Sequence, residues 1–315
     1  MSRIVATGLS KHYGTKLAVD NLSFQVEPGV VTGFLGPNGA GKSTTMRLML
    51  RLDHGAGQTL FDGKPYEQLT HPMRHVGAVL EAKAFHPTRT AHDHLLMLAA
   101  ANAIPRKRVD EVIEYVGLSA VTKAKPKSFS LGMGQRLGLA VALLGDPHTL
   151  ILDEPANGLD PHGIQWLRDL LKTLASQGRT VFVSSHLLPE MALMADELIV
   201  IGRGRLIASG TVDSFVSDFT RTSTLVRSPQ IDALIHAVVA AVPITEVTRD
   251  ADGTALLTSV ETAQVGEIAA AEGVVLHQLA TRTASLEEAF FEATGASEEY
   301  VGRLLPAEPS TGEPR

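Results

Sequence analysis

The sequence Gly36-Pro37-Asn38-Gly39-Ala40-Gly41-Lys42-Ser43 matches the pattern G-x-x-x-x-G-K-[ST]. The apolar run Val30–Leu35 before it predicts a buried strand, and the residues from about Gly41 to Arg51 predict a helix. Glycines in such a turn let backbone N–H groups curl around phosphate oxygens, and the helix adds the positive end of its dipole. The strand before the turn and the helix after it favour a phosphate-binding loop over an ordinary glycine-rich loop.

Two side chains of this loop have separate expected roles. Lys42 can reach the β- and γ-phosphates of a bound nucleotide, and the hydroxyl of Ser43 can bind Mg²⁺. The residues that we expect to hold the nucleotide here are Gly36, Pro37, Asn38, Gly39, Ala40, Gly41, Lys42, Ser43 and Thr44.

A second apolar run, Leu150–Leu152, ends in two acidic residues, Asp153 and Glu154. If this strand ends opposite the phosphate loop, Asp153 lies at the Mg²⁺ shell and Glu154 lies near the attacking water, as general base or orienting group. Two acids after an apolar run, taken alone, usually mark a solvated strand end. The phosphate-loop pattern favours the catalytic interpretation.

Two further motifs, together with those above, resemble motifs of the ABC ATPases. Residues Phe129–Met133 (FSLGM) resemble the family's signature motif in a variant that keeps its serine, Ser130, and its central glycine, Gly132. The spacing from Ser130 to Asp153 also resembles that of the family. The sequence NGLD at 157–160 resembles the family's D-loop, which here ends in Asp160.

Two single side chains complete the resemblance, which covers Ser2 to about Gly210. His186, at the end of a predicted strand, resembles the family's switch histidine, and Tyr13 resembles the aromatic residue that stacks on adenine. Taken alone, His186 would more often be a capping or surface residue, and Tyr13 a half-buried strand residue. Their places relative to the other motifs favour contacts with the γ-phosphate and the adenine.

The resemblance implies a P-loop ABC-type ATPase that uses ATP and Mg²⁺ as cofactors. It also implies that two copies sandwich two ATP molecules, with Ser130 and Gly132 of one copy completing the Lys42 site of the other. A plain helix N-cap at Ser130 is compatible with this role, because an anion uses the same free N–H groups. The expected catalytic residues are Lys42, Glu154 and His186, and the expected metal ligands are Ser43, Asp153 and Glu81.

Glu81 departs from the family pattern, in which a glutamine follows the strand predicted at Val76–Leu80. A carboxylate there can still bind Mg²⁺, directly or through water, but its charge would lie close to the triphosphate when no metal is bound. This segment, the variant signature motif and the later sequence SLEEAFF at 285–291 resemble the bacitracin- and lantibiotic-type branch of drug-exporter ATPases. We hypothesise that Glu81 couples metal and γ-phosphate occupancy to the helical region after it.

Alternating apolar runs and amphipathic stretches over the first ~215 residues predict an α/β fold. We expect the ATP-binding domain at 1–220, with a helical subdomain at about 82–130, an accessory α+β domain at 221–302, and a disordered tail at 303–315. The accessory domain has the order strand-helix-strand-strand-helix-strand, which predicts a ferredoxin-like fold with a last strand at Val274–Leu279. We expect a helix at Ser285–Thr294 to close it.

Composition excludes several classes of protein. The chain of 315 residues has a net charge of −6, which argues against binding to nucleic acid. It contains no cysteine, so disulfides and thiolate sites are excluded. The longest apolar runs, Leu95–Ile104 and Leu137–Leu144, are too short to span a membrane. We therefore expect the chain not to cross a membrane by itself.

We predict the ATP-hydrolysing subunit of an ABC exporter of an antibiotic, peptide or other hydrophobic compound. It would be a homodimer, or pair with a similar ATPase, at the cytoplasmic face of the cell membrane on integral permease subunits. One alternative is a soluble ABC ATPase acting on DNA or ribosomes; the single cassette, the absence of long heptads and the acidic balance argue against it. The other alternative is a regulatory protein built on an inactive ATPase. It is disfavoured because every position that ATP hydrolysis requires carries a residue able to do the chemistry.

Overall fold

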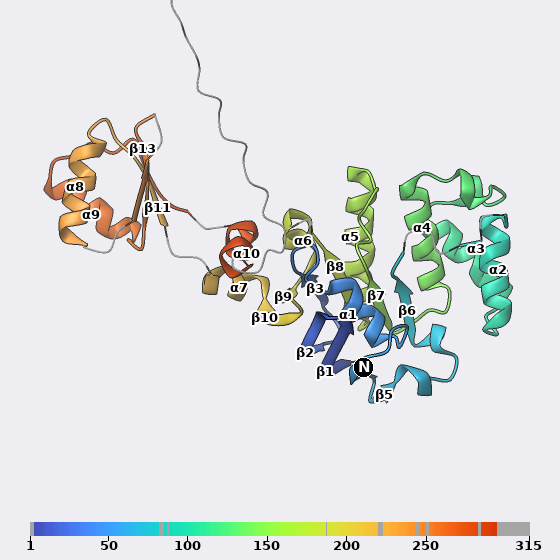
Figure 1. The fold of residues 1–315 in the computed structure, drawn as a ribbon. Coiled ribbons are helices and arrows are strands. Elements are labelled where there is room, and N and C mark those ends of the chain that lie inside the picture. The colour runs from blue at the N-terminus through green and yellow to red at the C-terminus, as the bar shows by residue number, and fades with distance from the viewer. Residues whose placement is uncertain are drawn as a thin grey trace, which may run out of the picture.

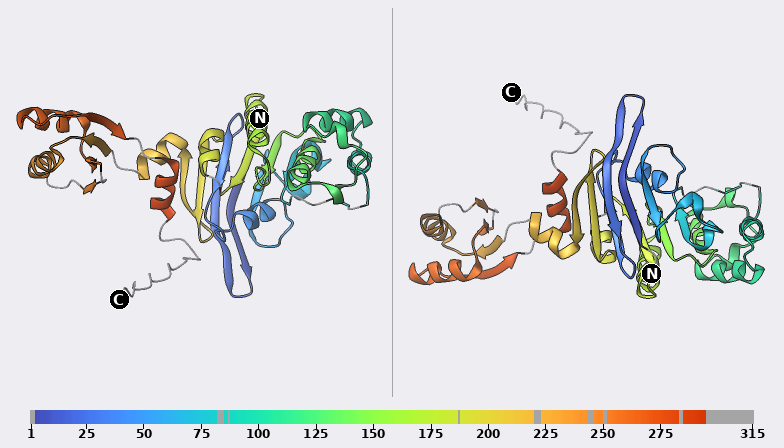
Figure 2. Two further views of the ribbon diagram at one scale, coloured as in Figure 1. Left: turned by 90° about the horizontal axis from the view of Figure 1, so that it is seen from above. Right: turned by 90° about the horizontal axis from the view of Figure 1, so that it is seen from below.

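The computed structural model describes residues 3–81, 85–86, 88–186, 188–219, 223–242, 246–249, 252–282 and 285–294. It consists of a large α/β body and a smaller α+β unit that stands apart from it (Figures 1 and 2). The tail predicted at 303–315 lies outside the described residues. So do the first residue of the resemblance, Ser2, and the expected domain boundary at 220–221.

The main sheet of the body has six strands in the order β10-β9-β3-β8-β7-β6. Its strands run parallel except for the antiparallel pair β9–β10. All residues of β3, β7 and β8 are buried, as expected for a parallel sheet covered on both faces. Their carboxyl ends meet at one edge, where ligands bind in such folds. The strands are β3 (Val31–Leu35), β6 (Val76–Val79), β7 (Thr149–Leu152), β8 (Thr180–Ser185), β9 (Glu197–Gly202) and β10 (Arg205–Thr211).

An antiparallel sheet of order β2-β1-β4-β5, which we did not predict, contributes to the core on one side of the main sheet. Phe24 of β2 stacks on Phe182 of β8, with ring centroids 5.5 Å apart, and lies 5.8 Å from the ring of Phe34 in β3. Helix α1 (Lys42–Met49), which follows the glycine-rich loop, packs into the same core through Met46 and Met49. The strands of this sheet are β1 (Ile4–Tyr13), β2 (Lys16–Val26), β4 (Ala56–Phe61) and β5 (Lys64–Pro65).

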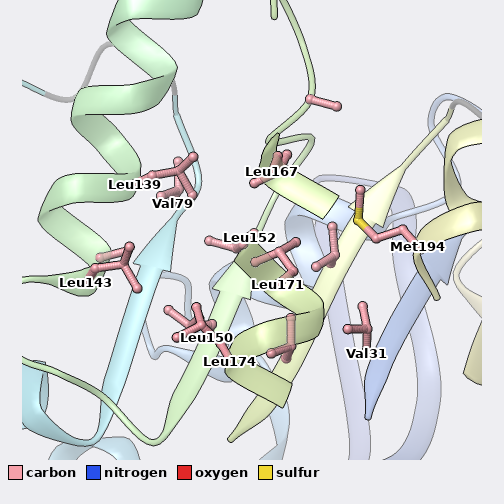
Figure 3. Packing of buried hydrophobic residues seen from close by; sticks show 14 of the residues in the cluster. Val31, Val79, Leu139, Leu143, Leu150, Leu152, Leu167, Leu171, Leu174 and Met194 are labelled. Carbon is pink, nitrogen blue, oxygen red and sulfur yellow. The ribbon is translucent and has the colours of Figure 1, made fainter. Parts of the chain in front are cut away.

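Helices α4 (Leu131–Leu143), α5 (Pro161–Ser176) and α6 (Leu188–Met194) supply the second apolar cluster (Figure 3). Leu139 and Leu143 of α4 lie beside Val79 of β6. A Cβ on Gly77 would lie 2.1 Å from the carbonyl oxygen of Ala142, so glycine is required for α4 to pack this closely on β6.

The helical subdomain is built from two short helices beside α4, close to the predicted positions. They are α2 (Ala91–Ala101) and α3 (Arg106–Tyr115), both within the range of about 82–130 expected for this subdomain. The hydroxyl of Thr90 caps α2 by accepting the N–H of Asp93 at 3.0 Å. Among the described residues of the body, 3-10 turns connect several elements: η1 (Tyr66–Gln68), η2 (Pro72–Arg74), η3 (Ser119–Val121) and η4 (Pro126–Ser128).

The smaller unit has the predicted ferredoxin-like arrangement, with an antiparallel sheet of order β12-β13-β11-β14. Its last strand was predicted too early in the sequence. The N–H of Val274 instead donates to the carbonyl oxygen of Ala269 at the end of the preceding helix, and the strand begins at Gln278. The elements are β11 (Ser223–Arg227), α8 (Ile231–Ala241), β12 (Glu246–Arg249), β13 (Thr254–Thr258), α9 (Thr262–Ala271) and β14 (Gln278–Arg282).

The last described helix, α10 (Leu286–Thr294), returns to the body and packs against α7 (Val212–Phe219) and α6. Ser285 and Glu288 form the expected reciprocal cap, with N···O distances of 3.2 and 3.0 Å. Phe290 joins the core that contains Phe215, so the prediction that this helix closes the smaller unit is wrong. The amphipathic pattern identifies an apolar face but not its partner. Within the described ranges, no helix is long and apolar enough to cross a membrane.

Candidate functional site

A pocket of about 530 Å³ lies at the carboxyl edge of the main sheet, beside the start of α1. The structure brings there most of the residues that we predicted to act together. The carboxylate of Glu154, the ring of His186 and the ring of Tyr13 all line it with the glycine-rich loop. The full lining is Tyr13, Lys16, Ala18, residues 37–44, Glu154, Asn157 and His186.

The backbone of the loop shows why glycine occupies two of its positions. Gly41, the N-cap of α1, has φ 102°, a conformation that L side chains rarely adopt. A Cβ on Gly41 would lie 2.5 Å from the carbonyl oxygen of Ala18, and one on Gly36 would lie 2.6 Å from that of Ile201. The loop is therefore held against β2 and β9, with the N-terminus of α1 at the pocket, where it favours an anion.

Lys42 is folded back onto the loop and is only 7% exposed. Its Nζ donates to the carbonyl oxygen of Gly36 at 2.6 Å and lies 3.9 Å from Oε1 of Glu154. Burial lowers the pKa of the Lys42 ammonium, an effect that the charges of Glu154 and Asp153 oppose. The buried ammonium therefore obtains its compensating negative charge from these two acids.

The two acids at the end of β7 are joined by Ser184 of the neighbouring strand β8. Its buried hydroxyl donates to Oδ1 of Asp153 and accepts the backbone N–H of Glu154 at 3.0 Å. Sequence analysis assigned no role to Ser184. The strand register could have indicated this contact. Leu152 pairs with Val183, so the next residues, Asp153 and Ser184, lie side by side.

Glu154 has φ 50°, which is strained for a residue with a side chain and persists only where the surroundings enforce it. Its carbonyl oxygen accepts the N–H of Asn157 at 3.1 Å and Nε2 of Gln135 at 2.9 Å. Its Oε2 lies 2.6 Å from Nδ1 of His186 and accepts the backbone N–H of His186 at 3.3 Å. The Glu154 carboxylate therefore lies between the ammonium of Lys42 and the imidazole of His186, next to the glycine-rich loop.

Tyr13 also lines the pocket, and its hydroxyl is bound to the segment that follows α1. Its hydroxyl donates to Oδ2 of Asp53 at 2.8 Å, and Nε of Arg47 donates to the same oxygen at 3.0 Å. The hydrogen bond to Asp53 raises the pKa of Tyr13, while Arg47 and Tyr13 lower the pKa of Asp53. The ring is 48% exposed, which leaves apolar surface for a ligand.

Ser130, Gly132 and Asp160 are not among the residues that line this pocket. The side chain of Ser130 caps α4, accepting the N–H of Met133 at 3.2 Å, and that of Asp160 caps α5 at 2.9 Å from the N–H of Gly163. Both capping residues are exposed. A role toward the nucleotide of a second copy stays a prediction for these three residues.

Glu81 also lies outside the pocket lining, and its side chain is 72% exposed. Its Oε1 lies 3.8 Å from Nη1 of Arg47, the same residue that binds Asp53. Across the part of the chain that the structure describes, no three His, Cys, Asp or Glu side chains are grouped so that they could hold a metal ion.

Comparisons with known proteins agree with this geometry. The family described as ABC transporter matches residues 19–157, and a domain of unknown function matches residues 222–287. The chain is 36% identical over 299 residues to an uncharacterized ABC transporter ATP-binding protein, YhcH of Bacillus subtilis, which covers 93% of this chain and 96% of YhcH.

Two further relatives carry names that state what they transport. The bacitracin transport ATP-binding protein BcrA of Bacillus licheniformis is 43% identical over 66% of this chain and 69% of its own. The lantibiotic transport ATP-binding protein SrtF of Streptococcus pyogenes is 35% identical over 65% of this chain and 89% of its own. A solved ATP binding subunit of an ABC transporter superimposes with a TM-score of 0.63, at 26% identity, over 69% of this chain and 92% of that one.

Proposed function

Because the chain belongs to the ABC transporter ATP-binding proteins, we propose that it hydrolyses ATP to power an exporter of an antibiotic, peptide or other hydrophobic compound. The observation that carries the ATPase assignment is one pocket in which Lys42, Glu154 and His186 converge on a phosphate-binding loop. The class of cargo is supported by the names of BcrA and SrtF. The variant motifs described above also resemble that branch.

The contacts of Glu154 indicate how ATP binding prepares hydrolysis. Its carboxylate contacts Lys42 at 3.9 Å and His186 at 2.6 Å. The γ-phosphate is a competing anion for both groups, so its arrival draws them away and leaves the carboxylate free to accept a proton from, or to orient, the attacking water. Lys42 and His186 then stabilise charge on the transferring phosphoryl group.

The residues proposed as Mg²⁺ ligands fit that ion by their chemistry. The hydroxyl of Ser43 is exposed at the pocket, and Asp153 is buried at the end of β7 with one oxygen bound by Ser184. Hydroxyl and carboxylate oxygens together with phosphates and waters are the ligands that Mg²⁺ prefers. When bound, the ion neutralises charge on the β- and γ-phosphates.

The remaining assignments are proposals of the same kind. Two copies pair so that Ser130 and Gly132 of each complete the nucleotide site of the other, and Asp160 lies at the same interface. The pair binds integral membrane permease subunits at the cytoplasmic face of the membrane. We also propose the division into an ATP-binding domain at 1–220 and an accessory domain from 221, with α10 added to the first because it packs on α6 and α7.

The experiment that tests the transport assignment is purification of the tagged chain from detergent-solubilised membranes of its own cell. We expect an integral membrane partner with several hydrophobic spans to copurify and to change ATP turnover when both are reconstituted in vesicles. Ribosomal or DNA partners in place of a membrane protein would support the soluble alternative instead. The same purification with Lys64→Met, an exposed change on β5, serves as the control.

Replacement of Tyr13 by alanine will weaken ATP binding if the ring stacks on adenine. Stacking of a base on an aromatic ring contributes about 1–3 kcal/mol, so we expect the Kd for ATP to rise about 5- to 150-fold. Tyr13→Phe keeps the ring and loses only the hydroxyl that binds Asp53, so its effect will be smaller. Calorimetric titration with ATP measures both; equal affinities of the alanine and wild-type proteins would exclude stacking.

Glu81→Gln removes the negative charge of Glu81 and keeps the shape of its side chain. One exposed charge contributes about 1 kcal/mol, so we expect the Mg²⁺ concentration for half-maximal turnover to rise about fivefold. Glu67→Gln is the matched control, because Glu67 is also an exposed acid paired with an arginine, Arg51, at 3.4 Å. Unchanged Mg²⁺ dependence, turnover and transport in the Glu81 variant would contradict the proposed coupling.

A further inference from the structure

Gln135, in the second turn of α4, is a buried polar residue with an unbalanced set of contacts. It is 2% exposed, and its Nε2 donates to the carbonyl oxygen of Glu154 at 2.9 Å. Its Oε1 is buried and finds no hydrogen-bond partner among the described residues. The amide thus makes one bond to the catalytic segment and leaves an acceptor unpaired.

Stability alone does not explain this side chain. A buried acceptor without a partner is unfavourable, and an apolar side chain of the same length would fill the site without that penalty. Methionine is unbranched and adapts to such a space. The contribution that an apolar residue could not make is the N–H donated to Glu154.

The residue that receives this bond is the one whose orientation hydrolysis depends on. Glu154 has a left-handed backbone, and its peptide groups are held on both sides: Ser184 accepts its N–H, and Gln135 donates to its carbonyl oxygen. The same carbonyl oxygen also accepts the N–H of Asn157 at 3.1 Å, from the segment that follows Glu154. Losing the bond from Gln135 would leave the carbonyl held from that segment alone, so the strained residue could relax and its carboxylate could leave its place near His186. A shift of about 1 Å in a reacting group can reduce a rate about 100-fold.

The bond also joins two parts of the fold. Gln135 lies on α4, the helix that Ser130 caps, while Glu154 follows β7 of the main sheet. A second contact joins the same segments, since a Cβ on Gly132 would lie 2.6 Å from the carbonyl oxygen of Gly158. The helix that carries the signature motif is therefore packed against the segment that follows Glu154 in its own chain.

We propose that Gln135 is a positioning residue for ATP hydrolysis: it holds the left-handed backbone of Glu154 from the signature helix and thereby aims the Glu154 carboxylate. The proposal rests on the role of Glu154 given above. It assigns to Gln135 no contact with the nucleotide, because Gln135 does not line the pocket.

Gln135→Met tests the proposal by removing the donor at nearly constant shape. We expect kcat to fall about 10- to 100-fold while KM for ATP and the Kd for ADP change less than about twofold. The melting temperature should stay within about 4 °C, because one bond and one unpaired acceptor are lost together. Gln165→Met, on the exposed side of α5, is the matched control and should leave kcat unchanged.

A double-mutant cycle separates positioning from a general structural effect. The Glu154→Gln protein lacks the carboxylate that Gln135 is proposed to orient. Adding Gln135→Met to this protein should therefore not slow its residual single-turnover hydrolysis further. Gln135→Glu, which replaces the donor by an oxygen, is the second variant if the methionine protein does not fold, and it should lose at least as much kcat.

Two results would overturn the proposal. One is a kcat within about twofold of wild type for both Gln135 variants; the other is an equal loss in the wild-type and Glu154→Gln backgrounds. Wild-type turnover of Glu154→Gln itself would instead remove the premise, because Glu154 would then not be the group that hydrolysis requires.

Discussion

Glu154→Gln will reduce ATP turnover about 10²- to 10⁴-fold, the range that a positioned general base contributes. The amide cannot accept a proton from the attacking water, while the phosphate loop and Lys42 are unchanged. ATP binding will therefore persist, and we expect the ATP-bound protein to accumulate as a dimer. Steady-state phosphate release and size-exclusion chromatography with Mg²⁺ and ATP measure the two effects.

The control for this prediction is Glu114→Gln, which removes one exposed acid from α3, outside the pocket. It should hydrolyse ATP at the wild-type rate and show no nucleotide-dependent dimer beyond that of wild type. Rapid hydrolysis by Glu154→Gln would falsify the assignment of Glu154. A monomeric Glu154→Gln protein that still binds ATP would contradict the proposed pairing of two copies.

Lys42→Met will weaken ATP binding about 10- to 150-fold, as expected for one lost hydrogen bond to a charged group, which contributes about 1.5–3 kcal/mol. Turnover will fall about 10²- to 10³-fold, because the ammonium also stabilises charge on the transferring phosphoryl group. Calorimetric titration and phosphate release measure the two effects. Lys64→Met, which removes an exposed lysine, is the control.

The same variant has a pH-dependent effect on the protein without nucleotide. Burial lowers the pKa of Lys42 below its ordinary value of 10.5, so between the two values the unfolded chain binds more protons than the folded one. The free energy of unfolding therefore gains a contribution that rises with pH through this window. Lys42→Met removes it, which denaturant unfolding at several pH values will detect as a flatter profile; an identical pH slope in both proteins would contradict the shift.

Much of the site could be predicted because the residues that carry its chemistry lie in short segments of the sequence. The glycine-rich loop combines a turn, a helix N-terminus and a lysine within eight residues, and Asp153 and Glu154 follow directly on a buried strand. In a parallel sheet, the carboxyl ends of strands meet at one edge, so β3, β7 and β8 must bring these segments and His186 together.

Other parts could not be predicted from local patterns. In the antiparallel sheet of β1, β2, β4 and β5, strand β1 pairs with β4, about 50 residues further along the chain, and this pairing depends on the core that the sheet covers. The packing of α10 on α7 joins apolar faces of two helices that are separated in the sequence by the whole smaller unit. The sequence identifies such faces, but it does not state which face covers which.

The sequence by itself therefore indicated the family, the ferredoxin-like order of the smaller unit and the side chains that we propose to bind the phosphates, because short motifs and local patterns carry each of them. Only the tertiary structure decided that Ser184 joins the two acids, that Gln135 holds the strained Glu154 from α4, and that Glu81 lies beside Arg47. These contacts depend on strand register and on how closely a helix approaches a sheet, which no single segment of sequence encodes.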